Sequence, residues 1–488
     1  MSKPAKVIPI MSASAEVEDS AQFVSMYQKQ PTIYPRAVKG WFANWRWVFV
    51  WLTQLLFYGL PWLQWSGRQA VLFDLDAQRF YIFGLLLYPQ DLIFLAALLV
   101  LSALALFFFT AVAGRLWCGY TCPQTVYTEI FMWAERKIEG DRVARMRLDQ
   151  QPWRWRKIWR KGAKHSAWLS IALFTGFSFV GYFTPIRELA ADVASWNLSG
   201  WNAFWVLFYG AATYGNAGFL REQMCKYMCP YARFQSALID KDSLIITYDA
   251  KRGDPRGSRS RKADSAAHGL GDCIDCTLCV QVCPTGIDIR NGLQNECIGC
   301  AACIDVCNDV MDKMGYAKGL IRYSTENGVV NGWTRLQMFK RALRPRVLIY
   351  GAVLSAASVT FAASVAMRSP FKFDVVKDRG ALARVVEEGA VENVYRIQIM
   401  NRTEAPQTYR VAASGIDGLE VVAMPASAGP AAVTSTSVSL RLPFVVAQGL
   451  AGRSVPVMFA VTGVEPTSGT SADRSAIQFE KSTFFIPR

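Results

Sequence analysis

The chain has 488 residues, a formal net charge of +15, 52% hydrophobic and only 19% charged side chains, twelve cysteines and two histidines. This apolar excess with few charges excludes a disordered chain, a collagen and a small disulfide scaffold. It indicates a membrane protein of several domains.

Residues 1–40 are expected to form a cytoplasmic tail, followed by a first membrane region over residues 41–249. No short apolar core with an A-x-A site lies near Met1, which argues against a cleaved signal peptide. Five stretches of at least 21 residues contain no Asp, Glu, Lys or Arg. About 20 apolar residues cross a bilayer as a helix, so we predict five transmembrane helices. They lie within residues 47–67, 92–114, 165–186, 193–220 and 347–367.

A sixth apolar run, residues 80–90, is too short to cross a bilayer and is expected to be an interfacial or re-entrant piece. The loops set the orientation, because Lys and Arg accumulate on the cytoplasmic side. Residues 1–46, 115–164 and 221–346 hold 37 Lys and Arg, whereas residues 68–91 and 187–192 hold 3. The first group is therefore predicted to be cytoplasmic, and everything after the fifth helix to lie on the far side. Membrane lipid explains the basic charge, so nucleic acid is not expected as a partner.

Two C-x3-C-P motifs follow the second and fourth predicted helices. Their cysteines are Cys118, Cys122, Cys225 and Cys229. Cysteines four apart share one side of a helical turn and the Pro can start a new helix, so four thiols can converge at the cytoplasmic membrane face. Thiolates are soft ligands suited to Cu(I), zinc or iron-sulfur, and Met224 and Met228 add thioethers beside the second pair. The alternatives are small apolar thiols at a membrane boundary and a reversible dithiol.

Residues 250–270 are basic and contain Gly and Ser, which predicts a flexible linker that either lies on anionic lipid or is an ordinary solvated loop. Residues 271–325 then carry the C-x2-C-x2-C-x3-C-P run of bacterial ferredoxins, repeated 24 residues later with Asn308 in place of the Pro. In two-cluster ferredoxins the fourth cysteine of each run binds the cluster of the other run.

This rule predicts two 4Fe-4S clusters. One is assigned to Cys273, Cys276, Cys279 and Cys307, the other to Cys297, Cys300, Cys303 and Cys283. A pair of zinc ribbons also uses C-x2-C, but two runs in identical register fit cubanes better. Disulfides are disfavoured in the cytoplasm, so all twelve cysteines are expected to bind metal or to take part in redox chemistry. Two neighbouring cubanes indicate electron transfer.

Missing motifs narrow the chemistry. A bis-histidine haem needs facing histidines within helices, whereas His165 starts the third run and His268 lies in a loop, so no haem is expected. Neither G-x-G-x-x-G after a strand nor G-x-x-x-x-G-K-[ST] occurs, so no nicotinamide or nucleotide site is expected. Electrons must then come from a separate donor, which we expect to be cytoplasmic.

Residues 326–346 are a cytoplasmic connector to the fifth helix, and residues 371–488 form the far-side tail. Alternating runs separated by Gly, Pro, Asn and Asp predict an all-β sandwich there. The runs are residues 394–400, 409–413, 419–423, 433–442, 455–461 and 477–485. The tail has no His, no Cys and no clustered carboxylates, so partner binding or a structural role is expected.

Nearly the whole chain resembles the CcoG family of cytochrome c oxidase accessory proteins, also called FixG or RdxA. The resemblance rests on residues 68–81, 118–142, 225–234, 276–289 and 297–325. It implies an immunoglobulin-like C-terminal domain and a location in the bacterial inner membrane. It also implies assembly of cbb3-type cytochrome oxidase, with Cu(II) reduced to Cu(I) at the C-x3-C-P cysteines and passed on with the help of oxidase subunits, assembly factors or a copper transporter.

Two other functions stay open. Twin cysteine-Pro motifs with ferredoxin runs are also similar to the NapH and NosR membrane proteins, which implies a quinol-linked electron-transfer subunit. The third possibility is a non-enzymatic scaffold whose β tail docks assembly intermediates.

Overall fold

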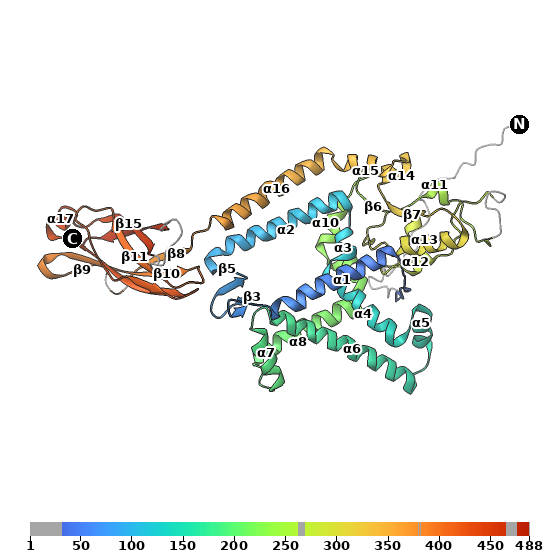
Figure 1. The fold of residues 1–488 in the computed structure, drawn as a ribbon, viewed down its shortest axis with the longest axis horizontal. Helices are drawn as coiled ribbons and strands as arrows, with labels where there is room; N and C mark the ends of the chain where they lie inside the picture. The colour runs from blue at the N-terminus through green and yellow to red at the C-terminus, as the bar shows by residue number, and fades with distance from the viewer. Residues whose placement is uncertain (1–31, 262–268, 379, 381, 465–475, 488) are drawn as a thin grey trace, which may run out of the picture.

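The computed structural model describes residues 32–261, 269–378, 380, 382–464 and 476–487. Most of the expected N-terminal tail and residues 262–268 of the expected linker, with His268, lie outside the described residues. The molecule is elongated (Figure 1), with a β sandwich at one end, the long helices in the middle and the cysteine-rich domain at the other end. The long helices therefore separate the two small domains.

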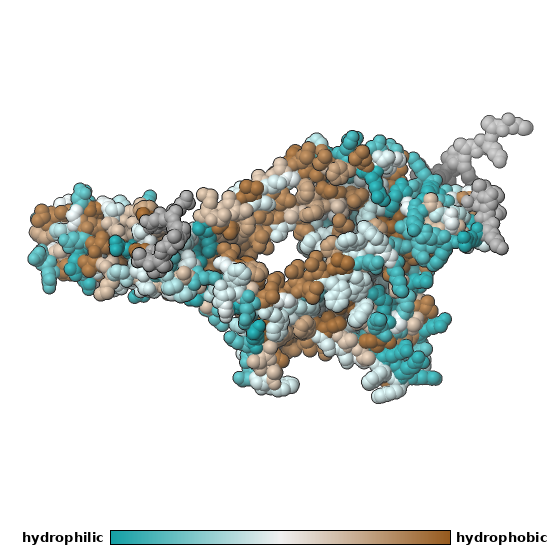
Figure 2. All heavy atoms as spheres, viewed as in Figure 1, coloured by the Kyte–Doolittle hydropathy of each residue, from teal (hydrophilic) through white to brown (hydrophobic). Residues whose placement is uncertain are grey.

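Each uncharged run of the sequence coincides with a helix. These helices are α1 (Trp41–Gly59), α2 (Leu92–Ala113), α6 (Trp155–Val180), α8 (Gly200–Gly215) and α16 (Pro345–Ala366). Among the described residues, only Pro89–Ala113 and Pro345–Ala366 are long and apolar enough to cross a membrane. Their most apolar windows are 0% and 6% buried. Figure 2 shows hydrophobic side chains gathered over the middle of the molecule and hydrophilic ones over its cysteine-rich end.

The other three helices fall short for identifiable reasons. The 16 residues of α8 rise about 24 Å, less than the roughly 30 Å of a bilayer core. The first ten residues of α6 include five Lys and Arg, and α1 contains Arg46 and several Trp. Helix α2 packs along α16, and α6 packs along α8. The count of five spans predicted from uncharged runs is thus not reproduced by helix length and hydropathy.

Shorter helices make up the rest of the described α-helical structure outside the cysteine-rich domain. They are α3 (Leu116–Tyr120), α4 (Pro123–Glu139), α5 (Arg142–Gln150), α7 (Ile186–Ala194), α9 (Arg221–Gln223), α10 (Pro230–Leu238), α11 (Ala250–Gly253), α14 (Glu326–Asn331), α15 (Arg335–Ala342) and α17 (Phe444–Gly449). Two π-helical turns, Asn216–Leu220 and Met224–Met228, flank α9. A Pro at the first position starts α4, α10 and α16, where its missing N–H would have no partner anyway.

The segment before α2 forms short strands. Residues 80–90, expected to form an interfacial or re-entrant piece, include most of β4 (Arg79–Ile82) and all of β5 (Leu85–Leu87). These strands join β3 (Val71–Asp74) in an antiparallel sheet that follows the hairpin β1 (Gln64–Trp65) and β2 (Arg68–Gln69). Strand β4 pairs with β3, which lies outside the apolar run, so a count of apolar residues misses the sheet. The Tyr88 hydroxyl then donates to the Asn401 carbonyl at 3.0 Å, and Asp91 forms an ion pair with Arg402. The β sandwich thus rests on this sheet.

The cysteine-rich domain is closed by two strands from far apart in the chain. Strand β6 (Ile245–Tyr248) pairs with β7 (Ile321–Ser324), and the short helix α12 (Leu278–Gln281) and α13 (Ala302–Met314) pack beside them. Their apolar side chains surround the cysteines.

Helix α2 ends at Gly114, where a side chain would meet the Leu244 carbonyl oxygen 2.9 Å away.

The tail confirms the predicted all-β sandwich. One sheet contains β8 (Phe371–Lys377), β9 (Arg384–Val385), β10 (Val391–Asn401), β12 (Glu420–Ala423) and β14 (Val433–Leu442). The other contains β11 (Gln407–Ser414), β13 (Ala426–Ala428), β15 (Ser454–Val464) and β16 (Ile477–Phe485). Inward residues alternate along β10 and β15, and the core between the sheets includes the fully buried Tyr395 and Phe459. The six predicted runs correspond to strands β10, β11, β12, β14, β15 and β16.

Candidate metal centres

The two ferredoxin-type runs wrap the chain in the same way. Asp275 and Gly299 occupy matching places with φ of 51° and 71°, and Thr277 and Ala301 match with φ of 55° and 59°. Positive φ is uncommon outside glycine, so its recurrence at both places shows a repeated backbone turn and not a coincidence of spacing. All twelve cysteines of the chain are free thiols.

The first set of cysteines surrounds one cavity. Its members are Cys273, Cys276, Cys279 and Cys307. Three come from the first run and one from α13 of the second run, which is the grouping predicted from the spacing. Arg290 lines the same cavity and pairs with Asp288 at 2.7 Å. A positive side chain therefore borders this space.

The second set surrounds a neighbouring cavity. Its members are Cys283, Cys297, Cys300 and Cys303. The structure thus brings together both predicted sets, each with one cysteine contributed by the other run. Cys279 of the first set also borders the second cavity, so the two spaces adjoin.

Each cavity fits an iron-sulfur cluster by its donors: four sulfur atoms in an apolar wall. Burial raises the pKa of Cys279 to about 11 and the pKa values of Cys297 and Cys307 to about 12. Cluster ligands are thiolates, so these protons must leave when metal binds. In the second set, burial raises the pKa of Cys303 well above its usual value.

The first C-x3-C-P motif lies directly against the second set. A side chain added at Gly119 would meet the Gly299 carbonyl oxygen at 2.6 Å and the Cys300 nitrogen at 2.9 Å. Reciprocally, a side chain at Gly299 would meet the Arg115 carbonyl oxygen at 3.0 Å. Two backbones approach this closely only where both residues are glycine. Cys118 is therefore one residue away from a backbone contact with the loop that carries Cys300.

The two C-x3-C-P motifs are built alike. Cys122 precedes the N-terminus of α4, and Cys229 precedes that of α10, each followed by a Pro at the first helical position. Burial raises the pKa of Cys122 and outweighs the opposing effect of the backbone N–H groups of Thr125 and Gln124 at the start of α4. Cys118 lies in α3 and Cys225 in the second π-helical turn, and both pack against the apolar side chains around the second set.

The thiols of the two motifs lie within electrostatic reach of one another. Burial, followed by the influence of Cys122, raises the pKa of Cys118 to about 12 and that of Cys225 to about 11. Gln235, which is fully buried in α10, donates from Nε2 to the Cys118 Sγ at 3.5 Å. A helix of the second motif thus contacts a cysteine of the first.

The four thiols are not drawn together around one ion. Within the described parts of the chain, no three His, Cys, Asp or Glu side chains converge closely enough to hold a single metal ion. Met224 is half-buried and Met228 is 58% exposed. His165 donates to or accepts from the Tyr214 hydroxyl at 2.8 Å between α6 and α8, so a structural contact accounts for it.

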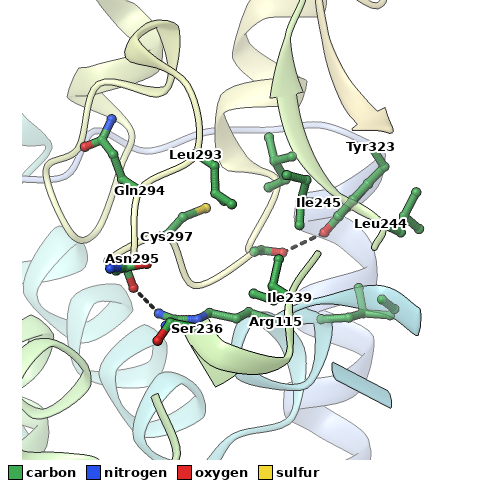
Figure 3. Close-up of a pocket in the computed structure, with 14 residues that line it drawn as sticks. Arg115, Ser236, Ile239, Leu244, Ile245, Leu293, Gln294, Asn295, Cys297 and Tyr323 are labelled. Carbon is green, nitrogen blue, oxygen red and sulfur yellow. Dashed lines mark hydrogen bonds between the residues drawn. The ribbon is translucent and has the colours of Figure 1, made fainter. Parts of the chain in front are cut away.

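A small cavity of about 70 Å³ marks the junction between the helices and the cysteine-rich domain (Figure 3). Arg115 reaches across it from the end of α2 and donates to the Asn295 carbonyl and, at 2.6 Å, to the Ala232 carbonyl. The Tyr323 hydroxyl donates to the Gly299 carbonyl at 2.6 Å. These two side chains hold the second cysteine loop in place against α3 and α10.

Sequence reasoning missed these junction residues. Arg46, which is 9% exposed, lies in a cavity with Cys225 and Glu129, and its Nε has no partner within the described chain. Arg46 and Arg115 flank apolar runs in the sequence, where the positive-inside pattern explains them without a site. Gly119 and Gly299 could have been singled out from the sequence, since each lies inside a cysteine motif. The spacing of the motifs does not show that the two glycines are in contact.

Known families match three parts of the chain. Residues 220–326 match the family described as a 4Fe-4S dicluster domain, and residues 95–140 match a 4Fe-4S binding domain. Residues 361–487 match the IG-like fold at the C-terminal of FixG. The second of these matches includes Cys118 and Cys122, which associates the first C-x3-C-P motif with iron-sulfur proteins.

Curated relatives match most of the chain. Nitrogen fixation protein FixG of Rhizobium meliloti is 35% identical over 80% of this chain and 80% of its own length. Protein RdxA of Cereibacter sphaeroides is 38% identical over 81% and 84%. Among solved structures, a FixG-related protein from Vibrio parahaemolyticus is 21% identical, with a TM-score of 0.20, over 24% of this chain and 97% of its own.

Proposed function

This chain belongs to the FixG/RdxA family, and from that premise we propose that it reduces Cu(II) to Cu(I) for the assembly of a cbb3-type cytochrome oxidase. The protein is an iron-sulfur electron-transfer protein with 4Fe-4S domains. The proposal adds the electron acceptor, the residues that bind it and the process that it serves.

One observation carries the proposal: the backbone contact between Gly119 and Gly299. It supports a short path from the second cysteine set to Cys118. We assign Cys273, Cys276, Cys279 and Cys307 to one 4Fe-4S cluster and Cys297, Cys300, Cys303 and Cys283 to the other. When bound, each cluster supplies a site that takes up and releases one electron.

Copper is the substrate, received by Cys118, Cys122, Cys225 and Cys229. Soft sulfur ligands favour Cu(I) over Cu(II), so a thiol-rich site stabilises the product of a one-electron reduction. Cys122 and Cys229 each precede a helix N-terminus, where backbone N–H groups can stabilise a metal-bound thiolate. Met224 and Met228 are assigned a lesser role as thioether ligands.

The membrane arrangement is part of the proposal. The protein is a multi-pass protein of the bacterial inner membrane in which α1, α2, α6, α8 and α16 all cross or enter the bilayer. The distribution of Lys and Arg supports a cytoplasmic N-terminus and cysteine-rich domain with a periplasmic β sandwich. Copper reduced on the cytoplasmic side then requires a separate copper transporter to reach the oxidase subunits.

The test is a double substitution, Cys122→Ser with Cys229→Ser, in the purified full chain. The protein is reduced anaerobically, Cu(II) is added, and the Cu(I) formed is counted against the electrons lost. We expect the double variant to keep its iron and sulfide and to lose copper reduction. Retained copper reduction would refute the site assignment. Loss of iron in the double variant would instead show that these thiols hold a further iron-sulfur cluster.

A scaffold function makes a different prediction for the β sandwich. The sandwich is fastened to the sheet before α2 by Arg402 with Asp91 and by Glu404 with Arg68 at 2.7 Å. Deleting residues 371–488 leaves a reductase able to reduce copper, whereas a scaffold loses oxidase assembly and has no copper reduction to lose. Measuring both quantities in the same deletion separates the two functions.

A further inference from the structure

A groove with a volume of about 860 Å³ lies beside the cysteine-rich domain, and none of the four C-x3-C-P cysteines lines it. Its floor is apolar, with Val112, Leu244 and Ile304, and aromatic side chains including Trp333 and Tyr323 form its walls. Pockets that bind small molecules have volumes of this order and combine an apolar lining with a few polar groups. The copper reaction does not use this groove.

The groove lies where the two most apolar helices end. Val112 belongs to the last turn of α2, and Ala342 ends α15, three residues before α16 begins. Phe339 of α15 borders the groove and is 67% exposed. A hydrophobic molecule that travels along α2 and α16 therefore meets the groove at the point where the helices leave the apolar region.

The same groove follows the helix that joins the two cysteine sets. Ile304 and Asn308 of α13 line it, and each comes directly after a predicted cluster ligand, Cys303 and Cys307. Tyr323 forms a wall, and its hydroxyl donates to Gly299, which precedes Cys300. A molecule in the groove would therefore contact α13, the helix that carries one predicted ligand of each cysteine set.

Polar groups sit at the inner end and along the rim. The Asn308 Oδ1 accepts from the Gly319 N–H at 3.0 Å, which leaves its Nδ2 without a partner in the described chain. Asp242 also lines the groove and accepts a hydrogen bond from the Asn327 side chain at 2.7 Å, and three basic side chains, Lys318, Arg322 and Arg335, line it as well. The amide N–H of Asn308 can donate a hydrogen bond to a carbonyl or hydroxyl oxygen on a ring. A carboxylate near the solvent can accept a proton that the ligand releases.

From this arrangement we propose that the groove binds a membrane quinol, which is the electron donor of the protein. The inference rests on the proposed function in one respect, because it takes copper to be the final acceptor of the electrons. A quinol carries an aromatic ring with two hydroxyl groups on a hydrophobic tail, and the groove offers aromatic walls, an amide donor and a path along two apolar helices. The soluble cytoplasmic donor expected from the sequence is the competing source.

The reaction balances without a further reactant. One quinol loses two electrons and two protons and becomes a quinone. The electrons pass to the iron-sulfur domain and then to two Cu(II) ions, which become two Cu(I) ions. The protons leave to water past Asp242, so no other oxidant or base is consumed.

The first test measures binding with no electron transfer. The full chain is placed in phosphatidylcholine nanodiscs, and binding of oxidised decylubiquinone is measured by calorimetry. Ala342→Trp fills the groove and is expected to weaken binding about tenfold or more. Leu343→Trp is the matched control, since Leu343 is 56% exposed and lies outside the groove lining. Asn308→Ala, which leaves room in the groove, is a second variant and is expected to weaken binding by removing the amide donor.

The second test adds decylubiquinol anaerobically to oxidised protein and follows the visible absorbance of the clusters. We expect quinol to reduce the wild type and Leu343→Trp but not Ala342→Trp, while dithionite reduces all three. Equal binding or equal reduction in the control and the filled variant would overturn the site. Reduction by a soluble carrier but not by quinol would overturn the donor. Copper reduction by protein that has been reduced with dithionite and then freed of excess dithionite reports separately on the proposed function, because that reductant bypasses the groove.

Discussion

The carboxylate of Asp305 caps α1 through Ala43, which lies 262 residues earlier in the chain. Its Oδ2 accepts a hydrogen bond from the Ala43 N–H at 2.8 Å, at the N-terminus of α1. Asp305 lies between two predicted cluster ligands, Cys303 and Cys307, and is 6% exposed. A carboxylate at the N-terminus of a helix accepts hydrogen bonds from N–H groups that have no partner within the helix. Its negative charge also interacts favourably with the positive end of the helix dipole. The cysteine-rich domain is therefore fixed to the first long helix by a buried cap.

Replacing this cap tests its importance. Asp305→Ala should lower the free energy of unfolding by about 1–2 kcal/mol, because the first N–H groups of α1 lose their partner. Thermal unfolding followed by the visible absorbance of the clusters measures the loss. Asp309→Ala is the control, since the Asp309 side chain is 56% exposed and its ion pair within the described residues is with the exposed Lys313. Equal effects of the two substitutions would argue against the cap.

The close contact between Gly119 and Gly299 predicts a functional defect. Gly119→Ala places a methyl group 2.6 Å from the Gly299 carbonyl oxygen, so α3 and the second cysteine loop must separate, at a cost of about 1–3 kcal/mol. We expect slower copper reduction with an unchanged iron content. Gly215→Ala in α8 is the matched control, because nothing lies within 4 Å of its new methyl group. An unchanged rate of copper reduction in Gly119→Ala would show that electron transfer does not depend on this contact, and the proposed function would lose its main support.

The crossed assignment of ligands is tested by single serine substitutions. Cys307→Ser should impair the cluster whose other three ligands precede it in the first run, although Cys307 lies in the second run. Cys283→Ser should impair the other cluster. Iron content together with EPR spectra of each reduced variant shows which signal is lost. Loss of the same signal in both variants would contradict the crossed pairing.

A buried carboxylate makes stability depend on pH. Glu135 pairs with Arg145 at 2.9 Å and with Arg221 at 3.1 Å, which ties α4 to the segment before Cys225. Burial alone would raise the pKa of Glu135, but the positive charges of Arg221 and Arg145 outweigh it and lower the pKa. Its stabilising contribution is therefore present above the unfolded pKa of about 4.3 and is lost as the pH falls through the lower folded pKa.

Glu135→Gln should remove this dependence. We expect the variant to be less stable near neutral pH by about 3–5 kcal/mol, since it leaves buried arginines unpaired. Its midpoint of thermal unfolding should also change less than that of the wild type between neutral and acidic pH. Glu188→Gln, at an exposed position of α7, should behave like the wild type. A wild-type pH profile that Glu135→Gln leaves unaltered would assign the acid sensitivity to other groups.

Local features of the sequence carried most of the prediction. The spacing within each cysteine run indicates iron-sulfur ligands, because three close thiols can wrap one cluster. Alternation of apolar and polar residues indicated the β sandwich, since side chains of a strand point to opposite faces. Uncharged runs indicated where helices lie but not how far they extend, because the ends depend on caps such as Gly114 and on charged turns such as the start of α6.

Only the tertiary structure shows which residues from distant segments of the chain contact one another. Asp305 caps α1, Gly119 meets Gly299, and Arg115 joins α2 to the second cysteine loop. The sheet before α2 also depends on strand pairing that a count of apolar residues does not detect. The sequence by itself determined the chemistry, because ligand type and spacing are local properties. The arrangement of the junction required the fold, because contacts between residues hundreds of positions apart leave no periodic signal in the chain.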